Sequence, residues 1–248
     1  MRILERTVYR GPHLFSRRPM IRFMLDLEAL EAYPTNRIDG FTDRLLAALP
    51  GLERHGCSVR APGGLIQRLR EGTWLGHVIE HVALELQVMA GAAVTRGKTR
   101  SVGGRPGVYN VLYCYENEVG GLAAGRLAVE LVASLLPRAL QSVHGLDRLH
   151  PPLPPAAGDG AVTGFKALAA LHAKGRLGPS TRALTQAADR RGIPWRRLDE
   201  HSPIRLGQGC RQKVIRASIT GQTSHIAVTT AADKDLTKRL LQAAGVPV

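Results

Sequence analysis

Apolar and polar residues alternate with two periodicities in the first half of the chain, one typical of short strands and one typical of helices. Strands are expected in the first part of residues 2–15, in the first part of residues 21–30, and over residues 108–117. Helical spacing of apolar residues, with Pro or Gly at the ends, predicts helices over 41–52, 61–72, 72–87 and 118–136. The basic, Gly-rich stretch 95–107 is predicted to be a loop.

The stretch HPPLPPAAGDG at 150–160 is the clearest break in the chain, because its prolines favour an extended spacer. Beyond it the pattern predicts a helix over 177–192 capped at Ser180 or Thr181, a strand over 193–198, two strands within 204–220 and a last helix within 230–248. The predicted fold class is α+β. A mixed α/β domain is expected at 1–145, a linker at 146–162 and a second α/β segment at 163–248.

Composition and charge describe a globular chain with a basic excess. The 248 residues are 44% hydrophobic and 22% charged, and their formal net charge is +14. Residues 1–150 hold 19 Lys and Arg against 14 Asp and Glu, whereas the remainder holds 15 against 6. This excess suits an acidic partner, and a solvated Arg-rich surface without a partner is the alternative interpretation.

The cysteines and the N-terminus indicate the cellular environment. Cys57, Cys114 and Cys210 are too widely spaced for a disulfide framework or a C-x-x-C metal site, so reduced thiols are expected. The N-terminus lacks an apolar core of signal-peptide length. No run approaches the roughly 20 apolar residues of a membrane span. The sequence therefore predicts a cytoplasmic protein without a membrane segment.

The predicted helix at 72–87 is apolar almost all the way round, yet it contains His77, Glu80 and His81 in the order H-x-x-E-H. Thr73 is expected to cap it and Gly91 to end it. Residues four apart share one helix face, so the two imidazoles have the spacing needed to bind one metal ion. This is the order of the inverted zinc peptidases, in which the histidines bind Zn²⁺ and the glutamate is the general base.

A catalytic zinc needs a third protein ligand. We expect Glu118 to supply it, because Glu118 begins a helix directly after a strand, and Glu116 and Glu85 are the next candidates. The alternative is a hydrogen-bonded polar cluster in the core, in which the H-x-x-E-H side chains bind no metal. The residues alone leave both interpretations open.

Longer stretches resemble a known family. RGPHLFS at 10–16, LPGLERHGCS at 49–58, REGTWLGHVIEHVALELQ at 70–87 and GVYNVLYCYENEVGGLAAGRLAV at 107–129 together resemble the N-terminal domain of the cyanophycin synthetases. Three later stretches resemble the start of that family's ATP-grasp domain: LGPSTRALTQAADRRGIPWRRL at 177–198, LGQGCRQKVIRASITGQTSHIA at 206–227 and DKDLTKRLLQAAGVPV at 233–248. The motifs are long, in order, and cover nearly the whole chain outside the linker.

The resemblance implies a role in making cyanophycin, a polymer with an aspartate backbone and arginine on its side-chain carboxyls. Full-length members use ATP and Mg²⁺ to join the two amino acids in an ATP-grasp domain and a Mur-ligase-like domain, while the N-terminal domain holds the polymer. In part of the family that domain resembles a zinc hydrolase that cuts polymer to supply fresh ends. Here His77 and His81 match its ligands, Glu80 its base, and Glu118 the expected third ligand.

Basic residues spread through the first domain are candidates to bind the polymer's carboxylates. They are Arg17, Arg18, Arg22, Arg68, Arg70, Arg96, Lys98, Arg100 and Arg105. The chain departs from the family pattern at His13 and Phe15, where the family has Asn and Trp, so the polymer surface is expected to differ. The family's phosphate- and Mg²⁺-binding parts would follow Val248, and no P-loop pattern is present, so this chain is not expected to ligate amino acids by itself.

Three functions stay open on the sequence. They are a polymer-binding part of a cyanophycin synthetase with a built-in zinc hydrolase, a polymer-binding or scaffold module with an inert H-x-x-E-H cluster, and a nucleic-acid binder. The last is disfavoured because aromatic stacking platforms, a recognised motif and C-x-x-C fingers are missing. Cyanophycin is the expected partner, without nucleic acid or membrane, and the resemblance also allows a homo-oligomer.

Overall fold

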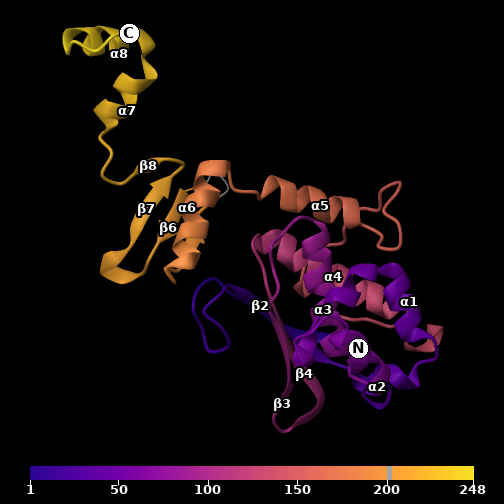
Figure 1. The fold of residues 1–248 in the computed structure, drawn as a ribbon. Helices are drawn as coiled ribbons and strands as arrows, with labels where there is room; N and C mark the ends of the chain where they lie inside the picture. The colour runs from indigo at the N-terminus through magenta and orange to yellow at the C-terminus, as the bar shows by residue number, and fades with distance from the viewer. Residues whose placement is uncertain (200–202) are drawn as a thin grey trace. The chain divides into compact units, whose positions relative to one another are not determined.

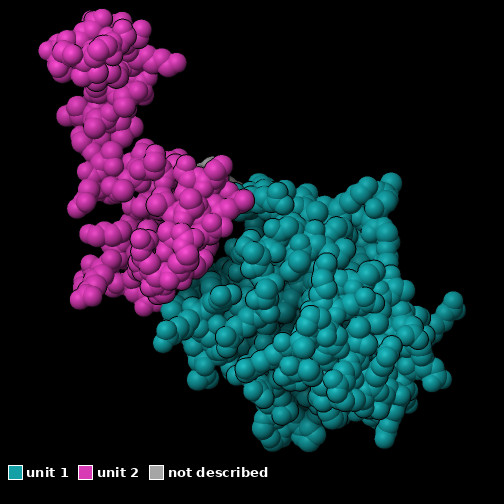
Figure 2. Space-filling view, viewed as in Figure 1, with its two compact units in different colours: residues 1–176 teal, residues 177–248 magenta. Residues whose placement is uncertain are grey.

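The structure is a computed structural model that describes residues 1–199 and 203–248. It divides into two compact units, unit 1 (Met1–Arg176) and unit 2 (Leu177–Val248), which Figure 2 shows in two colours. Unit 1 contains the whole H-x-x-E-H helix.

Unit 1 is built on a four-stranded antiparallel sheet with the strand order β1-β2-β4-β3 (Figure 1). The strands are β1 (Arg2–Tyr9), β2 (Met20–Asp26), β3 (Gly97–Val102) and β4 (Arg105–Cys114). The three strands expected from the sequence, at 2–15, 21–30 and 108–117, are confirmed as β1, β2 and β4.

Strand β3 was not expected, because the stretch 95–107 was predicted to be a loop. It pairs with β4 in a hairpin whose turn is Gly103-Gly104, between the partners Val102 and Arg105. Gly104 has a φ of 72°, a left-handed conformation that glycine adopts without steric cost. The glycines of this stretch therefore mark a hairpin turn and not a long loop.

Two long helices, α3 (Leu75–Met89) and α4 (Glu118–Ser134), pack against each other and against one face of the sheet. Gly76 of α3 lies close to Val111 and Thr99, where a Cβ atom would be 3.5 and 3.6 Å from their side chains. A Cβ atom on Gly125 of α4 would overlap the Tyr113 hydroxyl. Small residues thus let both helices approach the sheet closely.

The segment between β2 and α3 folds against the other side of α3. It contains α1 (Phe41–Ala48) and α2 (Gly64–Glu71), which the sequence predicts, and four short 3₁₀ helices. Leu45, Leu52, Leu65 and Leu69 from this segment are fully buried in the core that surrounds α3. The 3₁₀ helices are η1 (Glu28–Ala32), η2 (Thr35–Arg37), η3 (Pro50–Arg54) and η4 (Cys57–Val59), and two more, η5 (Arg138–Leu140) and η6 (Leu146–Arg148), follow α4.

The boundary between the units lies after Arg176, downstream of the linker predicted at 146–162. Helix α5 (Phe165–Lys174) packs on α4 and is therefore part of unit 1. Its Leu168 is fully buried in the core of that unit. Arg126 of α4 also joins the stretch before α5 to unit 1. Its guanidinium donates to Asp147 at 3.0 Å and to the carbonyl of His150 at 2.7 Å.

Unit 2 combines helices with a second antiparallel sheet in the order β5-β6-β7-β8. Its elements are α6 (Pro179–Arg190), β5 (Trp195–Arg197), β6 (Pro203–Leu206), η7 (Gly209–Arg211), β7 (Lys213–Arg216), β8 (Ile219–Thr220), α7 (His225–Ala232) and α8 (Lys234–Ala243). Helix α6 begins at Pro179 after Gly178, so the predicted cap at Ser180 or Thr181 is wrong. The last helix expected within 230–248 is confirmed as α8, which the Asp233 side chain caps, whereas α7 before it was not expected.

The mixture of helices and antiparallel sheets agrees with the α+β class. The likeness of 163–248 to the start of an ATP-grasp domain stays a prediction. Within the two described ranges, no helix is both long enough and apolar enough to span a bilayer.

If α5 belongs to unit 1, Leu168→Ala lowers the free energy of unfolding of that unit by about 2–5 kcal/mol, the usual cost of emptying a buried leucine site. The matched control is Val119→Ala on α4, also in unit 1, where the residue is 50% exposed and the expected cost is below about 0.5 kcal/mol. Urea unfolding followed by Trp74 fluorescence in a Trp195→Phe background reports on unit 1 alone. An unchanged Leu168→Ala midpoint contradicts the assignment.

Candidate functional site

The capping position of helix α3 lies one residue later than predicted. Trp74 occupies the capping position with extended backbone angles and without a side-chain capping bond. The Thr73 side chain turns instead toward His77, and its Oγ1 lies 3.0 Å from His77 Nδ1. The predicted capping role of Thr73 is therefore wrong, and the hydroxyl orients the first histidine of the motif.

The other ring nitrogen of His77 faces a cysteine that lies twenty residues earlier in the chain. His77 Nε2 is 3.2 Å from Cys57 Sγ. Cys57 opens the 3₁₀ helix η4 with a φ of 46°, a left-handed conformation that is uncommon for a residue other than glycine. Such strain persists only where the surrounding structure fixes it, and it is common at functional sites.

Backbone hydrogen bonds close the loop that carries Cys57. The N–H of Gly63 donates to the carbonyl of Glu53 at 2.9 Å, and the N–H of Leu65 donates to the carbonyl of His55 at 3.0 Å. Gly64 of α2 also approaches Gly56 so closely that a Cβ atom would overlap the Gly56 carbonyl. These contacts hold residues 53–65 against the start of α2 and fix the position of Cys57.

His81 lies one helical turn beyond His77 and contacts a third histidine. The ring centroids of His77 and His81 are 4.8 Å apart. His81 Nδ1 lies 2.8 Å from His55 Nδ1, and His55 Nε2 lies 2.9 Å from a carboxylate oxygen of Glu85. Glu85, a fallback metal ligand in the sequence analysis, therefore contacts His55.

Cys57, His77 and His81 form a group of side chains in unit 1 that could hold a metal ion. One possible ligand atom from each lies within 4.8 Å of the others. Burial lowers the pKa of His77 to about 4, with a further contribution from the charge of Arg68. Burial, assisted by the neighbouring histidines, lowers the pKa of His81 to about 3. Both imidazoles are therefore neutral at pH 7, the form that binds metals.

Glu80 points from α3 toward the sheet. Thr99 Oγ1 of β3 donates a hydrogen bond to Glu80 Oε2 at 2.6 Å. The side chain is almost completely buried, and burial raises the pKa of Glu80 to about 7, against the opposing effect of the Thr99 hydrogen bond. A carboxyl with a pKa near neutrality suits a general base or acid at physiological pH.

The structure does not bring Glu118 to the histidines. Glu118 accepts two hydrogen bonds from the Arg10 guanidinium, at 2.5 and 2.6 Å. The first turn of α4 lies against the end of α3, since a Cβ atom on Gly121 would be 3.4 Å from Gln87 Oε1. Gln87 is ten residues beyond His77, which corresponds to about 15 Å along a helix. The expectation that Glu118 is the third ligand is therefore wrong.

The remaining fallback, Glu116, accepts a hydrogen bond from the backbone N–H of Ala93 at 3.0 Å. Cys57 replaces the glutamates as the third side chain beside the two histidines. The local sequence gives no spacing signal for it, because a loop and a helix separate Cys57 from His77. The stretch LPGLERHGCS, quoted for its family resemblance, is the one feature that singles it out.

Several of the basic residues predicted to bind polymer share the sheet face that points away from α3 and α4. Arg22 of β2 and Lys98 of β3 both lie opposite Leu112 of β4, and Arg100 lies opposite Asn110. Thr99 and Phe23, which alternate with these residues, lie opposite Val111 in the row that faces the helices. Residues of opposite parity on a strand point to opposite faces, so the cations lie on the face without α3 and α4.

Further cations extend this face. Arg105 reaches Met24 Sδ at 3.5 Å, and Arg96 lies two residues before Lys98. Burial raises the pKa of Cys114 to about 11, and the nearby charges of Arg18 and Arg96 oppose that shift. We call this set the cationic sheet face: Arg18, Arg22, Arg96, Lys98, Arg100 and Arg105. The other candidates lie elsewhere, with Arg17 exposed between β1 and β2, and Arg68 and Arg70 on α2.

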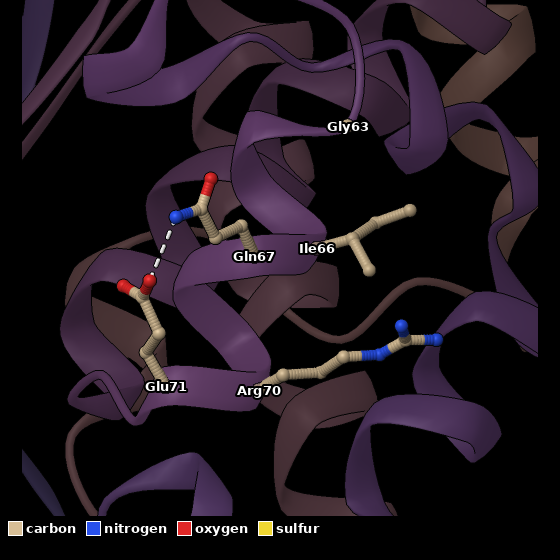
Figure 3. Close-up of a pocket in the computed structure, with 5 residues that line it drawn as sticks. All are labelled: Gly63, Ile66, Gln67, Arg70 and Glu71. Atoms are coloured by element: carbon tan, nitrogen blue, oxygen red, sulfur yellow. Dashed lines mark hydrogen bonds between the residues drawn. The ribbon is translucent and has the colours of Figure 1, made fainter.

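Figure 3 shows a hollow beside α2 that is separate from the cysteine–histidine group. It is lined by Gly63, Ile66, Gln67, Arg70 and Glu71, and Gln67 Nε2 donates to Glu71 Oε1 at 2.7 Å along the helix. The side chains that line it include a single cation and lack the histidines and cysteine of α3 and η4. The hollow is therefore not the candidate catalytic site.

Comparison with known proteins shows which sequences this chain resembles. Residues 22–137 match the family described as the cyanophycin synthase-like N-terminal domain. The chain is 42% identical over 250 residues, and over 100% of its own length, to cyanophycin synthetase of Trichormus variabilis. Residues 22–137 belong to the cyanophycin synthase-like N-terminal domain family, and the chain is similar along its whole length to cyanophycin synthetases. Cyanophycin synthetases of Nostoc sp. and Synechocystis sp. match the same 100% of the chain with 42% and 40% identity.

The chain spans 26–27% of the length of these cyanophycin synthetases. The match at 22–137 includes both η4 and α3. The cysteine–histidine group and its neighbouring glutamate therefore lie within the cyanophycin synthase-like N-terminal domain.

The approach of β3 to α3 predicts that Gly97 is required for the position of Glu80. A Cβ atom on Gly97 would overlap the Glu80 carboxylate, which is too buried to move freely. Gly97→Ala is therefore expected to cost about 1–3 kcal/mol in unfolding free energy. Gly103→Ala in the same hairpin is the control, because a Cβ atom there meets no neighbour within 4 Å. Equal urea midpoints for the two variants contradict this packing.

Proposed function

We propose that unit 1 is a zinc-dependent hydrolase domain that cleaves amide bonds of cyanophycin. The observation that carries the proposal is the convergence of Cys57, His77 and His81, one potential ligand atom each, within 4.8 Å, where the helix that supplies both histidines also carries the buried Glu80. The chemistry of this donor set fits Zn²⁺, which accepts thiolate and imidazole ligands and keeps one position open in catalytic sites. Cys57, His77 and His81 would hold the ion.

The burial of the individual side chains supports a substrate-facing side of the site. Cys57 and His77 are half-buried, whereas Glu80 and His81 are buried. Polymer would therefore approach from the η4 side, and the buried groups would lie behind the ligands. A bound Zn²⁺ would supply a Lewis acid that polarises the amide carbonyl and activates water.

Glu80 is the proton carrier in this proposal. Its Oε2 is occupied by the Thr99 hydroxyl, which leaves Oε1 to accept a proton from the attacking water. The water oxygen bonds to the amide carbon, the carbon–nitrogen bond breaks, and Glu80 returns the proton to the departing amine. Thr99 holds the carboxylate in place throughout.

A second function, polymer binding, is supported by the cationic sheet face. Cyanophycin carries carboxylates as well as guanidinium groups, so a binder requires separated charges of both signs. Arg22 is already paired with Glu5 at 3.0 Å, whereas Lys98 and Arg100 stand on the edge strand β3. We propose that this face holds polymer while the α3 site cuts it. The ligase activity of full-length relatives, with ATP and Mg²⁺, is carried to this chain only as a family expectation.

The hydrolase proposal predicts separate effects for the base and the ligands. With Zn²⁺ added, Glu80→Gln lowers the rate of polymer cleavage on the order of 10²–10⁴-fold and leaves zinc affinity nearly unchanged, because Glu80 is not a ligand. Cleavage is measured as newly formed amino ends and as a fall in polymer size. A Glu80→Gln protein that cleaves at the wild-type rate contradicts the proposal.

Zinc affinity distinguishes the ligand set of the structure from the one expected from the sequence. Cys57→Ser weakens Zn²⁺ binding by more than about 100-fold, above the 10–100-fold that is typical for loss of an outer-shell partner. Glu118→Gln leaves affinity unchanged, because Glu118 is paired with Arg10. Competition with a chromophoric chelator measures both. A wild-type protein that binds no zinc leaves polymer binding as the function of the domain.

The cationic sheet face predicts a salt-dependent loss of polymer affinity. A Lys98→Ala, Arg100→Ala double variant weakens binding between about twofold and thirtyfold, since each exposed ion pair contributes roughly 0.2–1 kcal/mol. The effect shrinks at high salt, where exposed charges are screened. Arg37→Ala, an exposed change on η2, is the control. Co-sedimentation with insoluble polymer measures binding, and equal losses for the double variant and the control contradict the assignment.

A further inference from the structure

Three side chains form a hydrogen-bonded series behind the site: the buried carboxylate of Glu85, His55, and the proposed metal ligand His81. Glu85 Oε2 lies 2.9 Å from His55 Nε2, and His55 Nδ1 lies 2.8 Å from His81 Nδ1. The Glu85 and His55 side chains are only 3% and 16% exposed. The proposed hydrolysis uses neither Glu85 nor His55, and yet both are held close behind His81.

The position of Glu85 is fixed by its packing. A Cβ atom on Gly51 of η3 would overlap the Glu85 carboxylate, so only glycine allows that carboxylate to lie against the backbone there. Arg54 Nη2 lies 3.9 Å from Glu85 Oε1, outside hydrogen-bonding distance. His55 is therefore the hydrogen-bonding partner that the distances assign to Glu85 Oε2.

The direction of the hydrogen bonds follows from which groups carry protons. A carboxylate only accepts, so His55 Nε2 must donate to Glu85. A neutral His55 has one N–H, which is used on Glu85, so in this state its Nδ1 presents a lone pair toward His81. His81 Nδ1 must then carry the proton of the 2.8 Å contact. The free lone pair of His81 is consequently on Nε2.

We infer that Glu85, through His55, is a positioning residue that holds His81 in the tautomer whose Nε2 is free to bind the metal. This inference rests on the proposed function, because it assigns His81 as a ligand. Metal-binding histidines commonly donate their second ring N–H to an outer partner that fixes the ring and its tautomer. Here the outer partner is another histidine, itself set by a carboxylate.

The two histidines of the motif differ in this respect. The partner of His77 Nδ1 is the Thr73 hydroxyl, at 3.0 Å. A hydroxyl can donate or accept, so Thr73 does not dictate where the His77 proton resides. The hydrogen bonds from Glu85 through His55 reach His81 and do not reach His77. Their loss is therefore expected to change the tautomer of His81 and leave His77 unchanged.

The first test needs no metal. Long-range ¹H–¹⁵N spectra of the full chain with ¹⁵N-labelled histidine, recorded on metal-free protein, distinguish a protonated ring nitrogen from one with a free lone pair. The expected result is a protonated Nδ1 and a free Nε2 for His81. The Glu85→Leu variant is expected to lose this single tautomer while His77 is unchanged. A wild-type His81 protonated on Nε2 overturns the inference.

The second test compares two substitutions of His55. His55→Leu removes the acceptor for the His81 Nδ1 proton and is expected to weaken Zn²⁺ binding about 10–100-fold. His55→Asn offers a side-chain oxygen in place of Nδ1 and is expected to restore affinity to within about threefold of wild type. Equal Zn²⁺ affinities for the Leu and wild-type proteins overturn the inference.

The two proposals fail in different ways. A wild-type chain that binds no Zn²⁺ contradicts the hydrolase proposal, and the spectrum of the metal-free protein still decides the tautomer of His81. A chain that binds Zn²⁺ and loses cleavage in Glu80→Gln, but keeps its affinity in His55→Leu, retains the hydrolase proposal and overturns the positioning role.

Discussion

Burial of helix α3 between the sheet and the 41–71 segment forces each ionisable side chain of that helix to find a partner. Glu80 takes the hydroxyl of Thr99 on the sheet side, and His81 takes His55 on the other side. A buried polar group without a partner costs roughly 1–3 kcal/mol, so the positions of these partners are set by the stability of the fold. The same contacts leave one face of the histidines directed at Cys57.

The sheet separates two kinds of chemistry. Its helix-facing side carries neutral or buried groups, of which Thr99 reaches directly to the proposed base. Its other side carries the cationic sheet face, where Arg96, Arg100 and Arg105 are exposed to water and Arg22 is largely buried. Because β3 contributes alternately to both sides, one short strand links the proposed cleavage site to the proposed polymer-holding surface.

Local patterns in the sequence were sufficient for most elements of unit 1 and for the two histidines. Strands β1, β2 and β4 and helices α1 to α4 follow from apolar spacing and from Pro and Gly at element ends. The prediction that Glu118 lies beside the histidines failed, because the direction of a side chain at the start of a helix is not known until the register between α3 and α4 is known. Cys57 depends on a strained loop residue and on closure of residues 53–65, which no local pattern encodes.

Strand β3 is an edge of the sheet, and its outer backbone groups have no strand partner in unit 1. Open edges invite pairing with the edge of another molecule, and charged side chains are a common protection against such aggregation. Lys98 and Arg100 lie on this edge, where the like charges of two copies would repel each other. Variants that neutralise both residues would therefore need to be checked for self-association before any loss of function is attributed to them.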